Sequence, residues 1–327
     1  MQEPLQEQDR GTERIDGIQK HNLGRLQISR VCNQRCVFCS RGAEVVQYSP
    51  ARIRAVIAEH KDSVCFEGGE PTLAPDVFKW IRHAKKSGVR DIVLVTNGHG
   101  LEDPALARRY LAAGVTLFNV NMPAHTEQAY DAVTQTRGNF PRRVAAVKNL
   151  IAAAGPKKVR LTFVVNTLML KSMPAYAAFI LREFPGLFYV EINALKLLGN
   201  SAARRWLVPP LSAAAPYLQK TFKLLSGGGL NFLTDGFPLC YMKGYEQHSI
   251  DAQAMARGET KFSMGEKGNC PPCARCTLAP LCSGPRKDYT ALFGWKELRP
   301  SKLDPAAVLA KFERPRGKAR RAAGKVG

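Results

Sequence analysis

The chain has 327 residues, of which 45% are hydrophobic and 23% are charged, and this ordinary globular composition excludes a collagen-like or wholly disordered chain. Its length allows one large α/β domain with an appendage, or two domains. The formal net charge of +21 indicates an acidic partner, which is a nucleic acid, an anionic membrane or an acidic protein.

The first 24 residues form a polar lead-in without an apolar run, so we expect neither a signal peptide nor a membrane anchor there. No stretch approaches the roughly 20 apolar residues that a membrane span requires. We therefore expect a cytoplasmic protein with no membrane partner, whose nine cysteines stay reduced. The cysteines fall into two clusters and one isolated residue, which is a pattern typical of metal sites.

Residues 25–200 alternate short apolar runs with amphipathic stretches. The expected strands read "RLQIS", "SVCF", "DIVLVT", "VTLFNVN", "VRLTFVVN" and "LFYVEIN". Helices are expected between them, because Ser49-Pro50 is a typical helix start and Gly88 and Gly114 are typical helix stops. Six such units in series predict a parallel sheet with helices outside, which curls into an open barrel or spreads into a doubly wound sheet.

Three polar motifs follow the first three expected strands. The loop "RVCNQRCVFCSRG" comes after the first strand, "GGEP" after the second and "TNG" after the third. Because the carboxyl ends of parallel strands share one edge of a sheet, these motifs are expected on one rim. That rim is the predicted active site.

The region after residue 200 has a different composition. Residues 201–300 contain a Pro-Pro break, one expected helix and the Cys-rich stretch "CPPCARCTLAPLCSGPRKDY". We expect a helical linker and a small extension folded around a metal centre, because such a segment buries too little apolar surface to fold alone. Residues 301–327 end in a basic run that has no acidic residue from Arg314 onward, and we expect this tail to be disordered.

The first cysteine cluster has the spacing C-x3-C-x2-C, formed by Cys32, Cys36 and Cys39. An iron–sulfur cube with four irons normally takes four cysteines, so three leave one iron open to another ligand. Half of a zinc site is the alternative interpretation of this spacing.

The stretch "CNQRCVFC" resembles the signature of the radical S-adenosylmethionine (radical SAM) superfamily. "GGEP" resembles the second signature of that family, "TNG" is typical after its third strand, and "AYDAVTQTRGNF" resembles a segment after its fourth strand. The resemblance spans residues 25–200. It implies an α/β fold, a partial (β/α)6 TIM-like barrel, to which the Cys-rich region adds a small C-terminal extension.

The resemblance also implies a mechanism. A [4Fe–4S] cluster held by Cys32, Cys36 and Cys39 would bind SAM at its open iron and cleave it reductively. The resulting 5′-deoxyadenosyl radical would then remove a hydrogen atom from the substrate. The cofactor-binding positions that it implies are Phe38, Gly68, Gly69, Glu70, Pro71, Thr96, Asn97, Asn119, Asn121 and Asn166.

Individual roles follow from the same resemblance. The glycine pair would approach the SAM amine closely, because glycine has no Cβ. Glu70 would accept a hydrogen bond from the ammonium group or brace the loop, and Phe38 would lie near the adenine. Asn119 or Asn121 would reach the ribose, and Asn166 is a further candidate for the same pocket.

The second cysteine set has the spacing C-x2-C-x5-C at its centre. This spacing resembles the core of the SPASM/twitch extensions of radical SAM maturases. Five cysteines suffice for one cluster, so the single-cluster twitch version is the better match, and we expect one auxiliary Fe–S cluster of the [4Fe–4S] type. The expected ligands are Cys240, Cys273, Cys276 and Cys282, with Cys270 as an alternate. A zinc ribbon is the alternative interpretation.

The sequence thus predicts a radical SAM enzyme in which an auxiliary cluster assists the oxidation, cross-linking or rearrangement of a peptide or small molecule. The alternative is an iron–sulfur or zinc protein that binds or modifies RNA. The net charge favours this alternative, whereas the basic tail has no interleaved aromatic residue to stack on bases. The positive charge also suits the docking of an acidic electron donor such as flavodoxin or ferredoxin.

Overall fold

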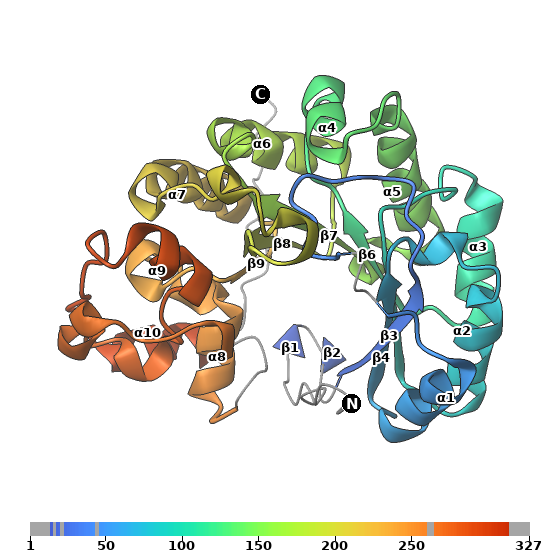
Figure 1. The fold of residues 1–327 in the computed structure, drawn as a ribbon, viewed down its shortest axis with the longest axis horizontal. Coiled ribbons are helices and arrows are strands. Elements are labelled where there is room, and N and C mark those ends of the chain that lie inside the picture. Colours follow the sequence, from blue (N-terminus) through green and yellow to red (C-terminus); the bar gives the residue numbers. More distant parts are fainter. Residues whose placement is uncertain (1–13, 16–17, 20–22, 43–45, 260–264, 314–327) are drawn as a thin grey trace, which may run out of the picture.

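The computed structural model describes residues 14–15, 18–19, 23–42, 46–259 and 265–313. Its centre is a sheet of seven parallel strands in chain order, which curves into an open barrel (Figure 1). These strands are β3 (Leu23–Ser29), β4 (Ser63–Gly68), β5 (Asp91–Thr96), β6 (Leu117–Asn121), β7 (Val159–Val165), β8 (Tyr189–Ala194) and β9 (Phe232–Asp235). A separate antiparallel pair joins β1 (Arg14–Ile15) to β2 (Ile18–Gln19). The partial α/β barrel predicted from the sequence is confirmed.

Helices connect the strands and cover the outside of the barrel (Figure 1). They are α1 (Pro50–Glu59), α2 (Val77–Lys86), α3 (Pro104–Ala113), α4 (Glu127–Thr134), α5 (Phe140–Ala154), α6 (Met173–Glu183) and α7 (Leu211–Gly227). Side-chain caps fix several of their starts, since Ser49 accepts from the Arg52 amide and Asp103 from the Ala105 amide. Gly114 ends α3 with a φ of 128°, a conformation that favours glycine.

The two faces of the sheet bury different side chains, because successive residues of a strand point to opposite sides. On the outer face, Leu26, Phe66 and Leu94 pack with the helices in the main core. The inner face carries a second apolar cluster: Cys65, Val93, Leu117, Phe188, Tyr189, Leu233 and Ile250. Its strand members lie in the amino-terminal halves of their strands. The cluster therefore fills that end of the barrel, whereas Glu67, Asn119 and Glu191 place polar side chains on the inner face nearer the carboxyl ends of β4, β6 and β8.

The seventh strand, β9, lies in a region that the sequence suggested was a linker. It pairs in parallel with β8, with Val190 opposite Phe232 and Asn193 opposite Asp235. The Phe222 ring of α7 stacks on Phe232, and their ring centroids are 4.8 Å apart. This separation is within the usual range for aromatic pairs, about 4.5–7 Å. A run of four residues is too short for a periodicity argument, so pairing and stacking decide its conformation.

The extension after β9 consists of short elements. Its helices are α8 (Ile250–Ala256), α9 (Lys287–Phe293) and α10 (Pro305–Glu313). Short 3-10 turns occur at η1 (Pro71–Leu73), η2 (Pro156–Lys158), η3 (Leu170–Ser172), η4 (Gly199–Ser201), η5 (Arg205–Leu207), η6 (Leu239–Tyr241), η7 (Glu246–His248), η9 (Pro271–Arg275) and η10 (Ala279–Leu281). In the part of the chain that the structure describes, no helix is long and apolar enough to span a membrane.

The expectation of a disordered tail from residue 301 is wrong for residues 305–313. These residues form α10, whose start is capped by a hydrogen bond from the Ala306 amide to Asp304. Val308 is buried, and Lys311 pairs with the fully buried Glu246 at 2.8 Å. Residues 314–327 lie outside the described residues, as does most of the N-terminal lead-in.

Candidate functional site

The three-cysteine loop follows β3 and is fixed by backbone hydrogen bonds at both sides. The Arg35 and Val37 amides donate to carbonyl oxygens at the end of α4, at 3.1 and 2.8 Å. On the other side, the Ser201 amide donates to the Cys39 carbonyl oxygen at 3.0 Å, and Arg204 Nη1 donates to the Val37 carbonyl oxygen at 2.9 Å. Cys32 is exposed, whereas Cys36 and Cys39 are partly buried. The protein thus holds the three thiols in place by its own packing.

Gly68 and Gly69 hold the cysteine loop against the end of β4. The Gly69 amide donates to the Ser29 carbonyl oxygen and the Glu70 amide to that of Val31, both at 2.7 Å. A Cβ on Gly68 would lie 2.4 Å from the Ser29 carbonyl oxygen, and one on Gly69 would lie 2.3 Å from that of Val31. Gly68 also has a φ of 132°. Both positions therefore require glycine for close backbone approach.

Glu70 joins the second motif to the third. It is 1% exposed, and its carboxylate accepts hydrogen bonds from Thr96 Oγ1 at 2.5 Å and from the Asn97 amide at 2.6 Å. The Thr72 amide donates to the same carboxylate at 3.1 Å. These bonds correspond to the bracing role suggested for Glu70, while a contact with the SAM ammonium group stays a prediction. Pro71 is buried in the following turn, η1.

The surroundings of Cys32 and Cys36 oppose the ionisation of these two thiols. Burial, and then repulsion from Cys39 and Cys32, raises the pKa of Cys36 far above its usual value. Burial also raises the pKa of Cys32, with the Glu70 carboxylate adding to the effect. Thiolates gathered here need positive metal charge to be stable. Three cysteines on one loop fit a cluster with one iron free of cysteine.

The asparagines expected near the cofactor occupy different environments. Asn119 on β6 accepts from Thr162 Oγ1 at 2.6 Å, whereas Asn121 Oδ1 is buried without a hydrogen-bond partner among the described residues. Asn166 is fully buried, and its Oδ1 accepts from the Leu168 and Met169 amides, which gives it a structural role in the turn after β7. Phe38 is 5% exposed and packs in the main core. Cofactor contacts of these residues stay predictions.

Glu67 is an inner-face residue that the sequence reasoning missed. It is 5% exposed, and Gln27 donates to it at 2.8 Å. Arg25 and Arg41 pair with its carboxylate at 3.1 and 2.6 Å. Burial alone would raise the pKa of Glu67, but the two guanidinium groups more than offset it and hold the pKa below its usual value. An ionised carboxylate therefore lies inside the barrel, close to the cysteine loop.

Four cysteines of the extension line one pocket with an empty volume of about 370 Å³. They are Cys240, Cys273, Cys276 and Cys282, while Cys270 is not among the lining residues. Burial and the neighbouring thiols raise the pKa of Cys240 to about 12. Among the described residues, no three His, Cys, Asp or Glu side chains are close enough together to hold a single metal ion. The four thiols instead surround a space, and four thiols around a pocket fit a larger, fully ligated cluster.

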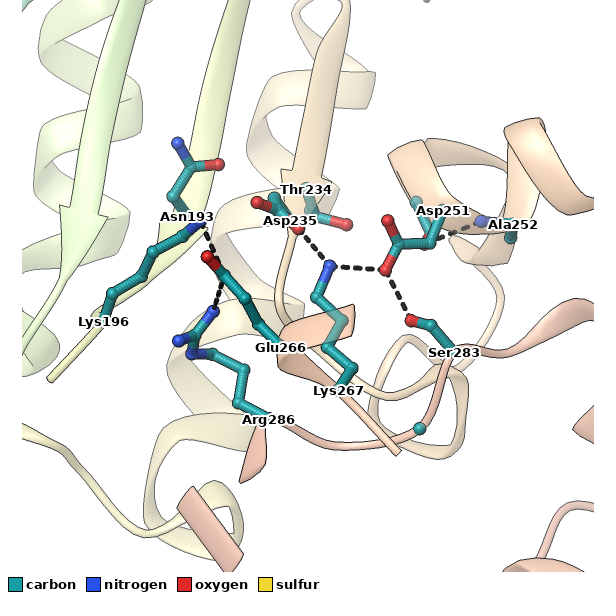
Figure 2. Close-up of polar contacts among 12 residues, drawn as sticks. Asn193, Lys196, Thr234, Asp235, Asp251, Ala252, Glu266, Lys267, Ser283 and Arg286 are labelled. Carbon is teal, nitrogen blue, oxygen red and sulfur yellow. Dashed lines mark hydrogen bonds and ion pairs between the residues drawn. The ribbon is translucent and has the colours of Figure 1, made fainter. Parts of the chain in front are cut away.

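The loop that carries Cys273, Cys276 and Cys282 is closed at its base by a buried ion-pair network (Figure 2). Lys267 and Arg286 form an antiparallel bridge there. Lys267 Nζ pairs with Asp235 at the end of β9 and lies 2.5 Å from Asp251 Oδ2 on α8. Arg286 pairs with Glu266 at 2.8 Å. The network therefore fixes the cysteine loop of the extension to the carboxyl end of a barrel strand.

A second pocket, of about 410 Å³, lies beside the thiol pocket. Its walls include the carboxyl ends of β7, β8 and β9, at Val165, Ala194 and Gly236. Both pockets are lined by Pro238 and Pro285. The extension thus brings its four thiols next to the same strand-end rim that carries the three-cysteine loop.

A family model described as the Radical SAM superfamily matches residues 26–177. A "Probable GTP 3′,8-cyclase" of Saccharolobus islandicus (strain L.S.2.15 / Lassen #1) is 33% identical over 149 residues, which are 43% of this chain and 47% of the relative. A protein of the same description from Metallosphaera sedula is 33% identical over 150 residues, 43% of this chain and 46% of the relative. The chain spans about half the length of these curated relatives.

Two solved structures share the fold. The structure of anSMEcpe with bound AdoMet and Kp18Cys peptide superposes with a TM-score of 0.53 at 18% identity, over 79% of this chain and 70% of that chain. Streptococcus suis SuiB bound to S-adenosylmethionine gives a TM-score of 0.51 at 12% identity, over 69% of this chain and 49% of that chain. At these identities the likeness concerns the fold.

Proposed function

We propose that the chain is an enzyme that cleaves S-adenosylmethionine reductively and acts on a substrate C–H bond, because residues 26–177 match the family model of the Radical SAM superfamily. When bound at Cys32, Cys36 and Cys39, a [4Fe–4S] cluster would supply the electron for the reductive cleavage of SAM, and with it the means to remove a hydrogen atom from the substrate. The observation that carries the proposal is the loop of three cysteines held by its backbone against the Gly68-Gly69 turn.

Different residues of this site are proposed to bind the cluster and SAM. Cys32, Cys36 and Cys39 are the proposed cluster ligands. Asn121 Oδ1 is the proposed acceptor for a ribose hydroxyl. It is buried at the carboxyl end of β6 and has no hydrogen-bond partner among the described residues. A buried acceptor without a partner is costly, and a bound ligand that donates a hydrogen bond removes that cost.

The pocket of four thiols is the proposed site of one auxiliary iron–sulfur cluster, with Cys240, Cys273, Cys276 and Cys282 as ligands. A cluster with four cysteines has no iron open to substrate, so its proposed role is to accept an electron after the substrate hydrogen is removed. The shared wall of Pro238 and Pro285 supports this role, because it places the thiol pocket next to the strand ends. Oxidation, cross-linking or rearrangement are the reaction types that fit such a centre.

The proposed substrate is a polar small molecule or a peptide that presents N–H or O–H groups. One buried acceptor supports this class, since Asn193 Oδ1 at the end of β8 has no partner among the described residues. Asn193 Nδ2 donates to Glu191 at 2.9 Å, and this bond orients the amide oxygen of Asn193. A donor on the substrate would satisfy this oxygen.

A nucleotide substrate is the second candidate, because two relatives with 33% identity are described as probable GTP 3′,8-cyclases. The matches cover 43% of this chain, so they do not extend over both the barrel and the extension. Incubation of the reconstituted enzyme with GTP, SAM and reductant, followed by mass spectrometry of the nucleotide pool, decides between the candidates. Recovery of unchanged GTP alongside SAM cleavage would exclude this second candidate.

The proposal is tested by anaerobic reconstitution with iron and sulfide, followed by SAM and dithionite. Mass spectrometry should detect 5′-deoxyadenosine and methionine from the native chain and neither from a soluble Cys36→Ala variant. The native chain should also contain about eight irons, two cubanes, per molecule. A colourless protein that contains zinc and leaves SAM intact would refute the proposed function and favour the zinc alternative.

An acidic electron carrier of the flavodoxin or ferredoxin class is the proposed reductant, because the net charge of +21 favours an acidic partner. Added salt should slow turnover with flavodoxin and leave turnover with dithionite unchanged. Equal effects of salt with both reductants would contradict this docking model.

A further inference from the structure

Behind the three-cysteine loop lies a buried arginine, Arg143, which the proposed mechanism does not yet use. It lies on α5 and is 3% exposed. Its Nε donates to the Tyr130 hydroxyl and its Nη2 to Asn97 Oδ1, both at 3.2 Å. Its Nη1 is buried and has no hydrogen-bond partner among the residues that the structure describes. In the described part of the chain, no carboxylate forms an ion pair with this guanidinium.

A buried charge without an opposite charge is expensive, so the site implies an anion that the protein residues do not supply. The nearby carboxylate of Glu70 is used elsewhere, because it accepts from Thr72, Thr96 and the Asn97 amide. Gly98 shows how closely the arginine is seated, since a Cβ there would lie 1.8 Å from Arg143 Nη1. The arginine is therefore held behind the loop by packing on several sides.

Two hydrogen-bonded paths lead from Arg143 to sulfur atoms of the loop. The first runs through Asn97, whose Nδ2 donates to Cys32 Sγ at 3.8 Å. The second runs through Tyr130 to Gln34, whose Nε2 lies 2.7 Å from the Tyr130 oxygen. Gln34 Oε1 lies 3.3 Å from Cys36 Sγ.

The hydrogen bonds of the second path can reverse their direction when Cys36 is a metal-bound thiolate. A thiolate accepts hydrogen bonds and cannot donate one, so the Gln34 amide turned by 180° would present its Nε2 to Cys36. Tyr130 would then donate to Gln34 Oε1 and accept from Arg143 Nε. Both paths would then run as donors from the guanidinium to the sulfur atoms.

We propose that Arg143 is the counter-charge of the cluster bound by the three-cysteine loop, and that it raises the reduction potential of that cluster through Asn97 and Tyr130. The inference rests on the proposed function, because it requires a cluster at Cys32, Cys36 and Cys39. One electron from an external low-potential donor enters the cluster, so the reduced form carries one more negative charge than the oxidised form. A buried cation stabilises the more negative form, and hydrogen bonds to cluster sulfurs act in the same direction.

The adjacent residue on the same helix provides a matched control. Arg142 is exposed and pairs with Glu102 at the surface, so Arg142→Gln removes one positive charge without touching the loop. Arg143→Gln removes the buried charge, and Arg143→Lys keeps it. Tyr130→Phe keeps the charge and the ring, and it interrupts only the path to Gln34.

The test is a redox titration of each reconstituted full-length variant, followed by electron paramagnetic resonance. The signal that changes on addition of SAM identifies the cluster in the barrel and separates it from the cluster in the extension. At a fixed solution potential, Arg143→Gln should lower the ratio of reduced to oxidised cluster at least tenfold, which is a shift of 59 mV for one electron. Arg143→Lys and Arg142→Gln should stay close to the native protein, and Tyr130→Phe should shift in the same direction by less.

The results distinguish a failure of the proposed function from a failure of the role proposed for Arg143. A native protein without a SAM-sensitive signal would refute the proposed function itself. A native signal with equal midpoint potentials in Arg143→Gln and Arg142→Gln would overturn only the inference about Arg143. If Arg143→Gln does not fold, Tyr130→Phe decides, and a native midpoint in that variant would equally overturn the inference.

Discussion

Replacement of Gly69 by alanine tests how closely the second motif supports the cysteine loop. The added Cβ would lie 2.3 Å from the Val31 carbonyl oxygen and 2.7 Å from the Val31 carbonyl carbon. Both contacts are with backbone, so the loop that begins the cysteine motif has to move. The move also disturbs the hydrogen bonds of the Gly69 and Glu70 amides to Ser29 and Val31.

The expected loss in free energy of unfolding follows from these contacts. Overpacking of this kind costs about 1–3 kcal/mol, and each disturbed hydrogen bond costs about 1 kcal/mol. We therefore expect Gly69→Ala to lower the free energy of unfolding by about 3–5 kcal/mol. Gly227→Ala is the matched control, because no described atom beyond its chain neighbours and its own helix backbone lies within 4 Å of the added Cβ, and alanine is the better helix former.

The assay is urea unfolding of the metal-free protein under reducing conditions, followed by equilibrium dialysis of SAM with the reconstituted protein. Gly69→Ala should lose stability and bind SAM at least tenfold more weakly, because the loop and the turn are displaced together. Gly227→Ala should be as stable as the native chain or slightly more so. Native stability and native SAM affinity in Gly69→Ala would refute the close-approach argument.

Further predictions concern the extension. Lys267→Met should destabilise the fold by about 3–5 kcal/mol, because it leaves buried carboxylates unpaired, whereas exposed Lys148→Met should cost less than about 1 kcal/mol in the same urea assay. Burial alone would raise the pKa of Asp235, but the charge of Lys267 lowers it, so this carboxylate stabilises the fold above about pH 4 and the effect is lost as the pH falls. Asp235→Asn should therefore flatten the acid side of the stability profile, and an unchanged profile would contradict the pairing. Cys276→Ser should lose about half of the iron and Cys270→Ser none, as measured by iron analysis; equal losses would place Cys270 among the ligands.

The barrel strands could be predicted from the sequence because each is a short apolar run between strong turn signals. The expected run "DIVLVT" coincides with β5 (Asp91–Thr96). The polar motifs were expected on one rim for a topological reason, and the structure joins them there through Glu70. Strand β9 was missed because its four residues depend on pairing with β8.

The residues missed at the site are those whose role depends on burial. Arg142 and Arg143 are identical neighbours in the sequence, but successive helix positions point about 100° apart, so one faces solvent and the other faces the loop. Lys267 likewise reads as a surface lysine, and only the fold brings Asp235 and Asp251 to it. The signal available for Arg143 was its place just after the segment "AYDAVTQTRGNF", which also contains Tyr130.

The central claim is that three cysteines hold a cluster with one iron free for SAM. Electron paramagnetic resonance of the reduced Cys276→Ser variant, with and without SAM, tests it most directly, because that variant should retain only the cluster of the barrel. The account predicts a cluster signal whose g values change when SAM is added. A signal that is identical with and without SAM, or no iron–sulfur signal at all, would contradict it.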